Sequence, residues 1–134
     1  MGCGSATPQK IINNDQLGQR VDTNDEWIQS RTGIRERRVI GANESLIDLA
    51  TDAALNAIKM ADWDVKTIDL IILATSTPDD LFGSAPKIQS NLGASNAVAF
   101  DLTAACSGFL FALVTASQYL ASGTMKRAVV IGAD

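Results

Sequence analysis

Apolar residues along this chain fall into two patterns, continuous runs and runs at helical spacing. The continuous runs are typical of strands that are buried on both faces of a parallel sheet. They predict strands at 68–75, 97–102 and 127–132. The helical spacing predicts helices at 46–61, 85–92 and 107–122. Because strands and helices alternate, the pattern predicts an α/β fold with a mostly parallel sheet.

The preceding part of the chain, residues 1–45, is more polar and predicts shorter elements. Residues 1–8 are expected to end a strand and form a turn, in which Gly2 and Gly4 supply small residues. The same two glycines could open a dinucleotide-binding loop, but the third glycine of that motif is absent, which favours the turn.

Two short helices are predicted next, each from a capping residue at its start. The first follows the cap residues at 13–15, and the second starts within residues 22–28, where acidic groups favour a helix N-terminus. Gly33 is placed to end the second helix. Residues 35–40 then predict a charged connector that leads to a turn at 41–43.

Composition narrows the function classes. The chain has 134 residues, a formal net charge of -4 and 46% hydrophobic residues, which indicates one folded domain with no bulk attraction for nucleic acid. It contains no histidine and two cysteines, Cys3 and Cys106, so no zinc-binding cluster is expected. Two distant thiols without a secretory signal indicate a reduced, cytoplasmic protein.

The stretch 102–125 carries no charge and is long enough to be compared with a membrane span. It nevertheless contains several polar side chains: Thr103, Ser107, Thr115, Ser117, Gln118, Ser122 and Thr124. A helix that faces lipid would accommodate these groups poorly. We therefore expect a buried central helix and no association with a membrane.

Cys106 is the candidate nucleophile. It lies among small residues between the strand 97–102 and the following helix, and the N-terminal end of a helix favours the thiolate form of a cysteine. The arrangement resembles a nucleophile elbow, in which the reactive side chain is held at a sharp turn. The alternative is a buried cysteine that acts as a small hydrophobic residue. A Cys–His pair cannot form within this chain, because it has no histidine.

Trp27 and Arg31 are candidate ligand-binding residues. They are four residues apart and share one face of the predicted helix, where an indole and a guanidinium could hold a planar base and a phosphate. The alternative is an exposed helix with a cation–π contact. The basic run 31–38 could attract phosphate or form a solvated face, and the adjacent carboxylates of Asp79 and Asp80 are interpreted as turn residues.

Four blocks of sequence together resemble beta-ketoacyl-[acyl carrier protein] synthase III, a thiolase-like condensing enzyme. They are VDTNDEWIQSRTGIRERRV (21–39), ILATSTPDDLFGSAPKIQSNLG (72–93), FDLTAACSGFLFAL (100–113) and RAVVIGAD (127–134). The resemblance covers essentially the whole chain. It implies the first condensation of type II fatty acid synthesis, in which acetyl-CoA and malonyl-acyl carrier protein give acetoacetyl-acyl carrier protein.

The resemblance also implies a role for individual residues. Cys106 would carry the acyl group, Trp27 would stack on the adenine of coenzyme A, Arg31 would contact its phosphates, and Thr23 would lie beside the adenine. Leu81 matches a residue that lines the acyl pocket of the partner subunit. The family forms homodimers through the strand that matches 97–102, and it uses the coenzyme A thioester as a substrate without a separate cofactor.

The resemblance implies that proteins of this family are more than twice as long as this chain. Their catalytic histidine and asparagine come from the second half of the family fold, which this chain does not match. The expected fold is therefore the N-terminal half of a thiolase-like fold, truncated, with residues 1–134 as one incomplete half-domain that is inactive alone. Two alternatives remain open. The chain could be a non-catalytic half-domain that binds coenzyme A or dimerises, or it could belong to a related thiolase-fold acyltransferase of the polyketide synthase type.

Overall fold

The computed structural model describes residues 1–78 and 81–134, so the predicted turn residues Asp79 and Asp80 lie outside the described residues. The chain divides into two compact units, which are described separately. The larger unit comprises Met1–Ala6 and Leu46–Asp134, and the smaller unit comprises Thr7–Ser45.

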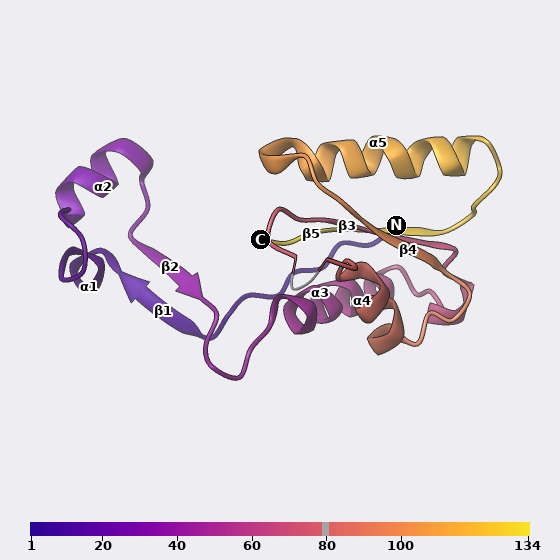
Figure 1. The fold of residues 1–134 in the computed structure, drawn as a ribbon, viewed down its shortest axis with the longest axis horizontal. Coiled ribbons are helices and arrows are strands. Elements are labelled where there is room, and N and C mark those ends of the chain that lie inside the picture. The colour runs from indigo at the N-terminus through magenta and orange to yellow at the C-terminus, as the bar shows by residue number, and fades with distance from the viewer. Residues whose placement is uncertain (79–80) are drawn as a thin grey trace. The chain divides into compact units, whose positions relative to one another are not determined.

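The larger unit is a three-layered α/β structure around a parallel sheet (Figure 1). In this sheet β3 (Leu70–Ala74) pairs with β4 (Val98–Leu102) on one side and with β5 (Ala128–Gly132) on the other, and both pairings are parallel. The helices α3 (Leu46–Met60) and α4 (Ala85–Leu92) cover one face, and α5 (Gly108–Ala121) covers the other. The predicted α/β architecture is therefore confirmed.

The central strand β3 is buried on both faces because helices cover both sides of the sheet. Its residues alternate between two hydrophobic clusters: Ile71 and Leu73 pack in the cluster that includes α3 and α4, whereas Leu70 and Ile72 pack with Ala112 and Ala116. All five β3 side chains are at most 5% exposed. This double burial explains why the strand is a continuous apolar run in the sequence.

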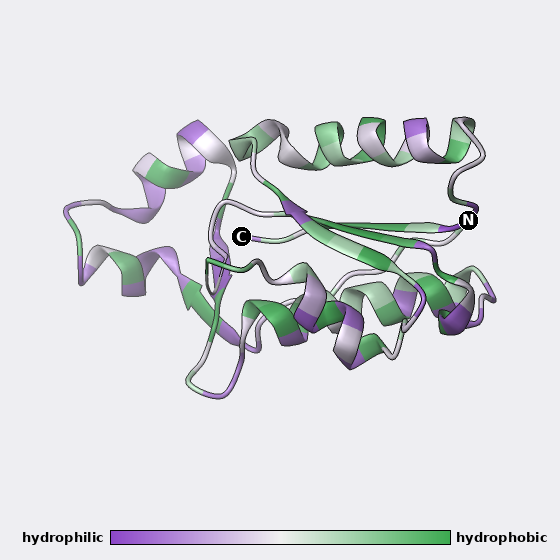
Figure 2. Cartoon of the chain, turned by 45° about the vertical axis from the view of Figure 1, so that its right-hand side comes forward, coloured by the Kyte–Doolittle hydropathy of each residue, from purple (hydrophilic) through white to green (hydrophobic). Residues whose placement is uncertain are grey.

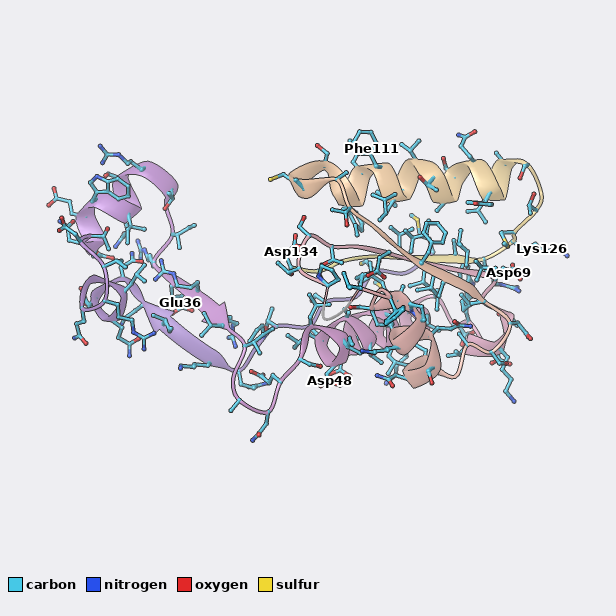
Figure 3. The ribbon with its side chains drawn as sticks, viewed as in Figure 1. Glu36, Asp48, Asp69, Phe111, Lys126 and Asp134 are labelled. Atoms are coloured by element: carbon cyan, nitrogen blue, oxygen red, sulfur yellow. The ribbon has the colours of Figure 1, made fainter. Side chains whose placement is uncertain are left out.

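The helix α5 buries only the face that it turns toward the sheet, through Gly108, Ala112 and Ala116. Figure 2 shows that apolar residues continue around the helix, and Figure 3 shows Phe111 pointing away from the sheet. Phe111 is 54% exposed and Leu110 is 64% exposed. The prediction of a buried helix is thus confirmed for one face of α5. In the described chain the sheet covers that face, and no second layer covers the opposite face.

No helix in the part of the chain that the structure describes combines the length and the apolar character needed to cross a membrane.

Residues 1–6 pack against α3 and form no strand, so the predicted end of a strand is not found there. A Cβ atom on Gly4 would collide with the carbonyl oxygen of Ala53 and would lie 2.5 Å from the nitrogen of Ala57. One on Gly2 would meet the carbonyl oxygen of Ala57 in the same way. The two glycines are therefore required for close approach to the α3 backbone, and neither has a positive φ.

The smaller unit combines a two-stranded sheet with two short helices. In the sheet, β1 (Lys10–Asn13) pairs antiparallel with β2 (Glu36–Val39), and the helices α1 (Asn14–Gly18) and α2 (Asp25–Thr32) lie between them in the sequence. The helix ends follow the predictions: Asn13 forms a capping box at the start of α1, and Gly33 ends α2 with a φ of 71°. The predicted connector at 35–40 is wrong, because most of it is β2.

Candidate functional site

The carboxyl ends of the three parallel strands meet at one edge of the sheet. Ala74, Leu102 and Gly132 occupy one row of the register. Beyond this row the backbone of Thr75 donates to the carbonyl of Leu102 at 3.1 Å, and that of Ala133 donates to the carbonyl of Ala74 at 3.1 Å. Ligands of open α/β sheets bind at this type of edge, so it is the first place to look for chemistry.

Cys106 lies directly beyond this edge, in the short turn Ala105–Ser107 that connects β4 to α5. Its side chain is a free thiol and is exposed. The preceding residue Ala105 has a φ of 45°, a left-handed conformation that costs a non-glycine residue about 1–3 kcal/mol. The predicted strand–turn–helix setting of the cysteine is confirmed, and in the described part of the chain Cys106 is exposed and not buried.

The start of α5 leaves backbone donors next to this thiol. Ser107 is the N-cap residue of α5, and its side chain makes no capping hydrogen bond. The first N–H groups of a helix have no partner within the helix, and they carry its positive partial charge. A thiolate or a developing oxyanion at Cys106 would therefore lie close to a region that favours negative charge.

Hydrogen bonds connect the loop after β3 to the residues that follow β4 and β5. The hydroxyl of Thr103 donates to the carbonyl of Thr75 at 2.9 Å. The carboxylate of Asp134 accepts the N–H of Ser76 at 2.6 Å and the hydroxyl of Thr75 at 3.4 Å. The sequence interpretation missed Asp134, because its partners are far away in the sequence and local patterns report only contacts between near neighbours.

Leu81 lies in the loop before α4 and is completely exposed. The loop ends at Gly83, which has a φ of 87° and packs against Asp101 of β4: a Cβ on Gly83 would lie 3.2–3.3 Å from the carboxylate atoms. A fully exposed leucine gains nothing from burial within this chain. Its position is therefore compatible with a contact outside the chain.

In the smaller unit, Trp27 and Arg31 share one face of α2, as predicted. The Arg31 guanidinium lies over the Trp27 ring at 4.5 Å from its centroid, and both side chains are exposed. Thr23 precedes this helix, and its hydroxyl oxygen is buried without a hydrogen-bond partner among the described residues. The pair thus presents a planar ring and a cation together.

Two arginines of the basic run 31–38 are engaged in hydrogen bonds within the fold. Arg37 donates to the side chain of Asn14 at 2.6 Å and to the carbonyl of Ile12 at 3.2 Å, and Arg38 donates to the carbonyl of Pro8 at 2.9 Å. These two arginines therefore hold β2 against the rest of the smaller unit. Within the run, Arg31 is the arginine that the cation–π contact holds in a defined, exposed position.

The predicted site residues thus form two groups. Cys106 and Leu81 belong to the larger unit, and Thr23, Trp27 and Arg31 belong to the smaller unit. Sequence reasoning missed Asn14, Asp101 and Asp134, which hold the elements that carry these residues. In the sequence, Asn14 was one of the predicted cap residues, Asp101 lay within a predicted strand and Asp134 followed another, and none of these positions indicated the distant partners.

Known proteins resemble this chain along its whole length. A family model for 3-oxoacyl-[acyl-carrier-protein (ACP)] synthase III matches residues 100–134, which include the Cys106 turn. Proteins named beta-ketoacyl-[acyl-carrier-protein] synthase III match all 134 residues, at 90% identity in Prochlorococcus marinus (strain NATL2A) and 69% in Prochlorococcus marinus (strain MIT 9313). The chain spans 40% of the length of each of them.

Solved structures show the same fold. The 3-oxoacyl-[acyl-carrier-protein] synthase III of Aquifex aeolicus VF5 is 44% identical, with a TM-score of 0.94 over 98% of this chain and 42% of its own. A priming beta-ketosynthase from the R1128 polyketide biosynthetic pathway is 35% identical, with a TM-score of 0.94 over 98% of this chain and 40% of its own. In sequence and in fold, the chain is the counterpart of about two-fifths of a beta-ketoacyl-[acyl carrier protein] synthase III.

Proposed function

We propose that Cys106 is the acyl-carrying nucleophile of the initiating condensation in type II fatty acid synthesis, within a protein of the relatives' full length. The observation that supports this most is the exposed thiol in a left-handed turn at the start of α5. Such a turn holds a nucleophile away from its own backbone and next to the N-terminal end of a helix, which favours negative charge.

Two steps account for the reaction. The Cys106 thiolate attacks the carbonyl carbon of acetyl-CoA, a new thioester forms, and coenzyme A leaves as a thiolate that takes up a proton. Malonyl-acyl carrier protein then loses carbon dioxide, and the resulting carbanion attacks the acyl-cysteine. Acetoacetyl-acyl carrier protein is formed and the cysteine thiolate is released. The chain contains no histidine, so a histidine that assists the decarboxylation would lie outside these 134 residues.

Coenzyme A is the ligand proposed for the smaller unit. Adenine would stack on the exposed Trp27 ring, and the Arg31 guanidinium, which lies over that ring, would pair with a phosphate. The buried hydroxyl of Thr23 would gain a hydrogen-bond partner beside the base. The thioester is itself the substrate, so the reaction requires no separate cofactor.

A homodimer and the carrier protein are the proposed partners. Among the described residues, β4 pairs on one side only, which leaves an edge that a second copy could extend through the predicted strand 97–102. Leu81 would then reach the acyl pocket of the partner subunit. We propose a cytoplasmic location, which the two free thiols of the chain support, and we expect neither nucleic acid nor a membrane as a partner.

A second candidate is priming in polyketide synthesis. It is favoured by the similarity to the priming beta-ketosynthase, which superimposes as well as the Aquifex aeolicus synthase does. The competing primers are acetyl-CoA and longer acyl-CoA thioesters. A non-catalytic half-domain that only binds coenzyme A or dimerises remains the alternative in which Cys106 accepts no acyl group.

Transfer of radiolabelled acetyl from acetyl-CoA tests the proposal. The protein used is a full-length host, meaning a protein of the relatives' length that carries this chain. Cys3 provides a matched control, since it is the other free, exposed cysteine of the chain. We expect Cys106→Ser to abolish labelling and Cys3→Ser to preserve it. Labelling that survives in Cys106→Ser would refute the nucleophile, and a preference for longer primers would favour the polyketide role.

A further inference from the structure

Asn14 is the buried polar centre of the smaller unit. It is the first residue of α1, and its side chain is 1% exposed. The buried hydrophobic residues of this unit are Ile12 and Ile28. Because so little apolar surface is buried, packing alone gives these short helices a weak orientation. A fully satisfied polar group in this position can supply the missing specificity.

The side-chain amide of Asn14 connects both ends of α2. Its Nδ2 donates to Oδ1 of Asp25, the first residue of the helix, at 2.8 Å. The same nitrogen donates to the carbonyl of Ile34, directly after the C-cap Gly33, at 2.8 Å. One amide therefore forms hydrogen bonds at both ends of the helix that carries Trp27 and Arg31.

The orientation of this amide is determined by its partners. Arg37 donates to Oδ1 of Asn14 at 2.6 Å, and a guanidinium cannot accept a hydrogen bond. On the other side, the Asp25 carboxylate and the Ile34 carbonyl are acceptors, so they require the NH₂ group. Rotating the amide by 180° would break all three contacts, and the geometry is therefore unique.

The network continues to the helix itself. Gln29 donates its side-chain amide to Oδ2 of Asp25, one helical turn away. The hydrogen bonds from Gln29 and Asn14, with the positive charge of Arg35, hold the pKa of the Asp25 carboxyl below its usual range. Burial on α2 itself is confined to Ile28, so these polar contacts decide which face of the helix is outward.

We propose that Asn14 is a positioning residue that holds α2 so that Trp27 and Arg31 present one ligand-binding face. The inference rests on the proposed coenzyme A site and adds the residue on which the geometry of that site depends. Asn14 contacts no ligand: it acts through Asp25, Ile34 and Arg37. Its loss should weaken coenzyme A binding and leave the chemistry at Cys106 intact, since the network includes no residue of the cysteine turn.

The test is Asn14→Asp in the full-length host. A carboxylate keeps the shape of the side chain and an acceptor for Arg37, but it faces Asp25 and Ile34 with acceptors only. Asn13→Asp is the matched control, because Asn13 is adjacent and exposed and aspartate caps a helix as well as asparagine does. Asp25→Ala is a milder second variant that removes one anchor and keeps Asn14, in case Asn14→Asp fails to fold.

Two readouts separate positioning from general stability. Calorimetry with coenzyme A gives the Kd, and steady-state kinetics give KM and kcat. Trp27 and Trp63 are the two tryptophans of the chain, so a Trp63→Phe background reduces the indole signal of this chain to Trp27. We expect Asn14→Asp to raise Kd and KM by about tenfold, to leave kcat within about twofold and to shift the Trp27 emission. Asn13→Asp should change none of them.

Failure of the inference and failure of the coenzyme A site give different results. If Trp27→Ala and Arg31→Ala weaken binding but folded Asn14→Asp and Asp25→Ala do not, the positioning role is refuted. If Trp27→Ala and Arg31→Ala leave the Kd unchanged, the coenzyme A site itself is refuted. The Trp27 emission of Asn14→Asp then decides whether Asn14 orients α2.

Discussion

The carboxylate of Asp101 accepts the backbone N–H of Ala85, the first residue of α4, with Oδ1 2.7 Å from the nitrogen. Its other oxygen accepts the N–H of Ser84 at 2.8 Å. Ser84 is the N-cap residue, but its own side chain makes no capping hydrogen bond. A strand residue therefore caps this helix, and it connects the loop that carries Leu81 to the strand that leads to Cys106.

Replacing Asp101 should destabilise the larger unit. We expect Asp101→Ala to lower the free energy of unfolding of the full-length host by about 1–2 kcal/mol, since it removes the cap of α4. Asp101→Asn keeps one acceptor oxygen and should cost less. Urea denaturation measures both, and equal stability of wild type and Asp101→Ala would contradict the capping role.

Gly4 should tolerate no larger residue. In Gly4→Ala the new methyl group would collide with the Ala53 carbonyl of α3. We expect a loss of about 1–3 kcal/mol because the N-terminal segment must move away from the helix. Gly93→Ala is the comparison: Gly93 has a φ of 73° but open space around it, so it should lose only about 1 kcal/mol from backbone strain. Thermal unfolding that ranks the two in the opposite order would argue against this close packing.

Asp69 should make stability depend on acidic pH. Its carboxylate accepts the backbone N–H groups of Lys126 at 2.8 Å and Arg127 at 3.0 Å, and Figure 3 shows Asp69 beside Lys126. These hydrogen bonds, the one from Lys126 first, and the two positive charges lower the pKa of the Asp69 carboxyl below 3.8.

Because the folded pKa is lowered, the contribution of Asp69 is complete above the unfolded pKa and is lost as the pH falls through the folded value. We therefore expect the stability difference between wild type and Asp69→Asn to be constant near neutral pH and to shrink below about pH 4. Urea midpoints between neutral and acidic pH give this difference. A difference that does not change with pH would show that ionised Asp69 does not stabilise the fold.

Replacing Ala105 should affect the stability of the protein and the reactivity of Cys106 in different ways. Glycine adopts its left-handed φ without strain, so Ala105→Gly should leave the stability unchanged or raise it by up to about 1 kcal/mol. The turn becomes less rigid, and we expect the acetylation of Cys106 to slow down. Ala104→Gly is the control, because Ala104 has a φ of -152° and glycine there only adds flexibility to the unfolded chain. A less stable Ala105→Gly protein would indicate that Ala105 is not strained.

Elements that depend on neighbouring residues could be predicted from the sequence. The helix 85–92 with Gly93 after it, the helix cap within residues 13–15 and the end of α2 at Gly33 all agree with the structure. So does the strand–turn–helix around Cys106, because an apolar run followed by small residues and helical spacing is a local pattern.

The strand β2 could not be predicted because its sequence is charged and its partner β1 lies more than twenty residues earlier. Two-stranded sheets with exposed faces carry little alternation of apolar and polar residues, which is the signal that sequence reasoning uses. The interactions of Asn14 and Asp101 could not be predicted either, because their partners are 11 or more residues away in the sequence. A polar residue has many candidate partners at such separations, and only the folded structure determines which one it contacts.

Local sterics and hydrogen bonds within three or four residues determined the helices, their ends and the apolar strands, so the sequence alone specified these and the setting of Cys106. Tertiary structure decided which polar side chains act across long separations and which face of α5 is buried. Those outcomes depend on which surfaces the folded chain brings together, and the free energy of burying a polar group reverses sign according to whether a partner is present.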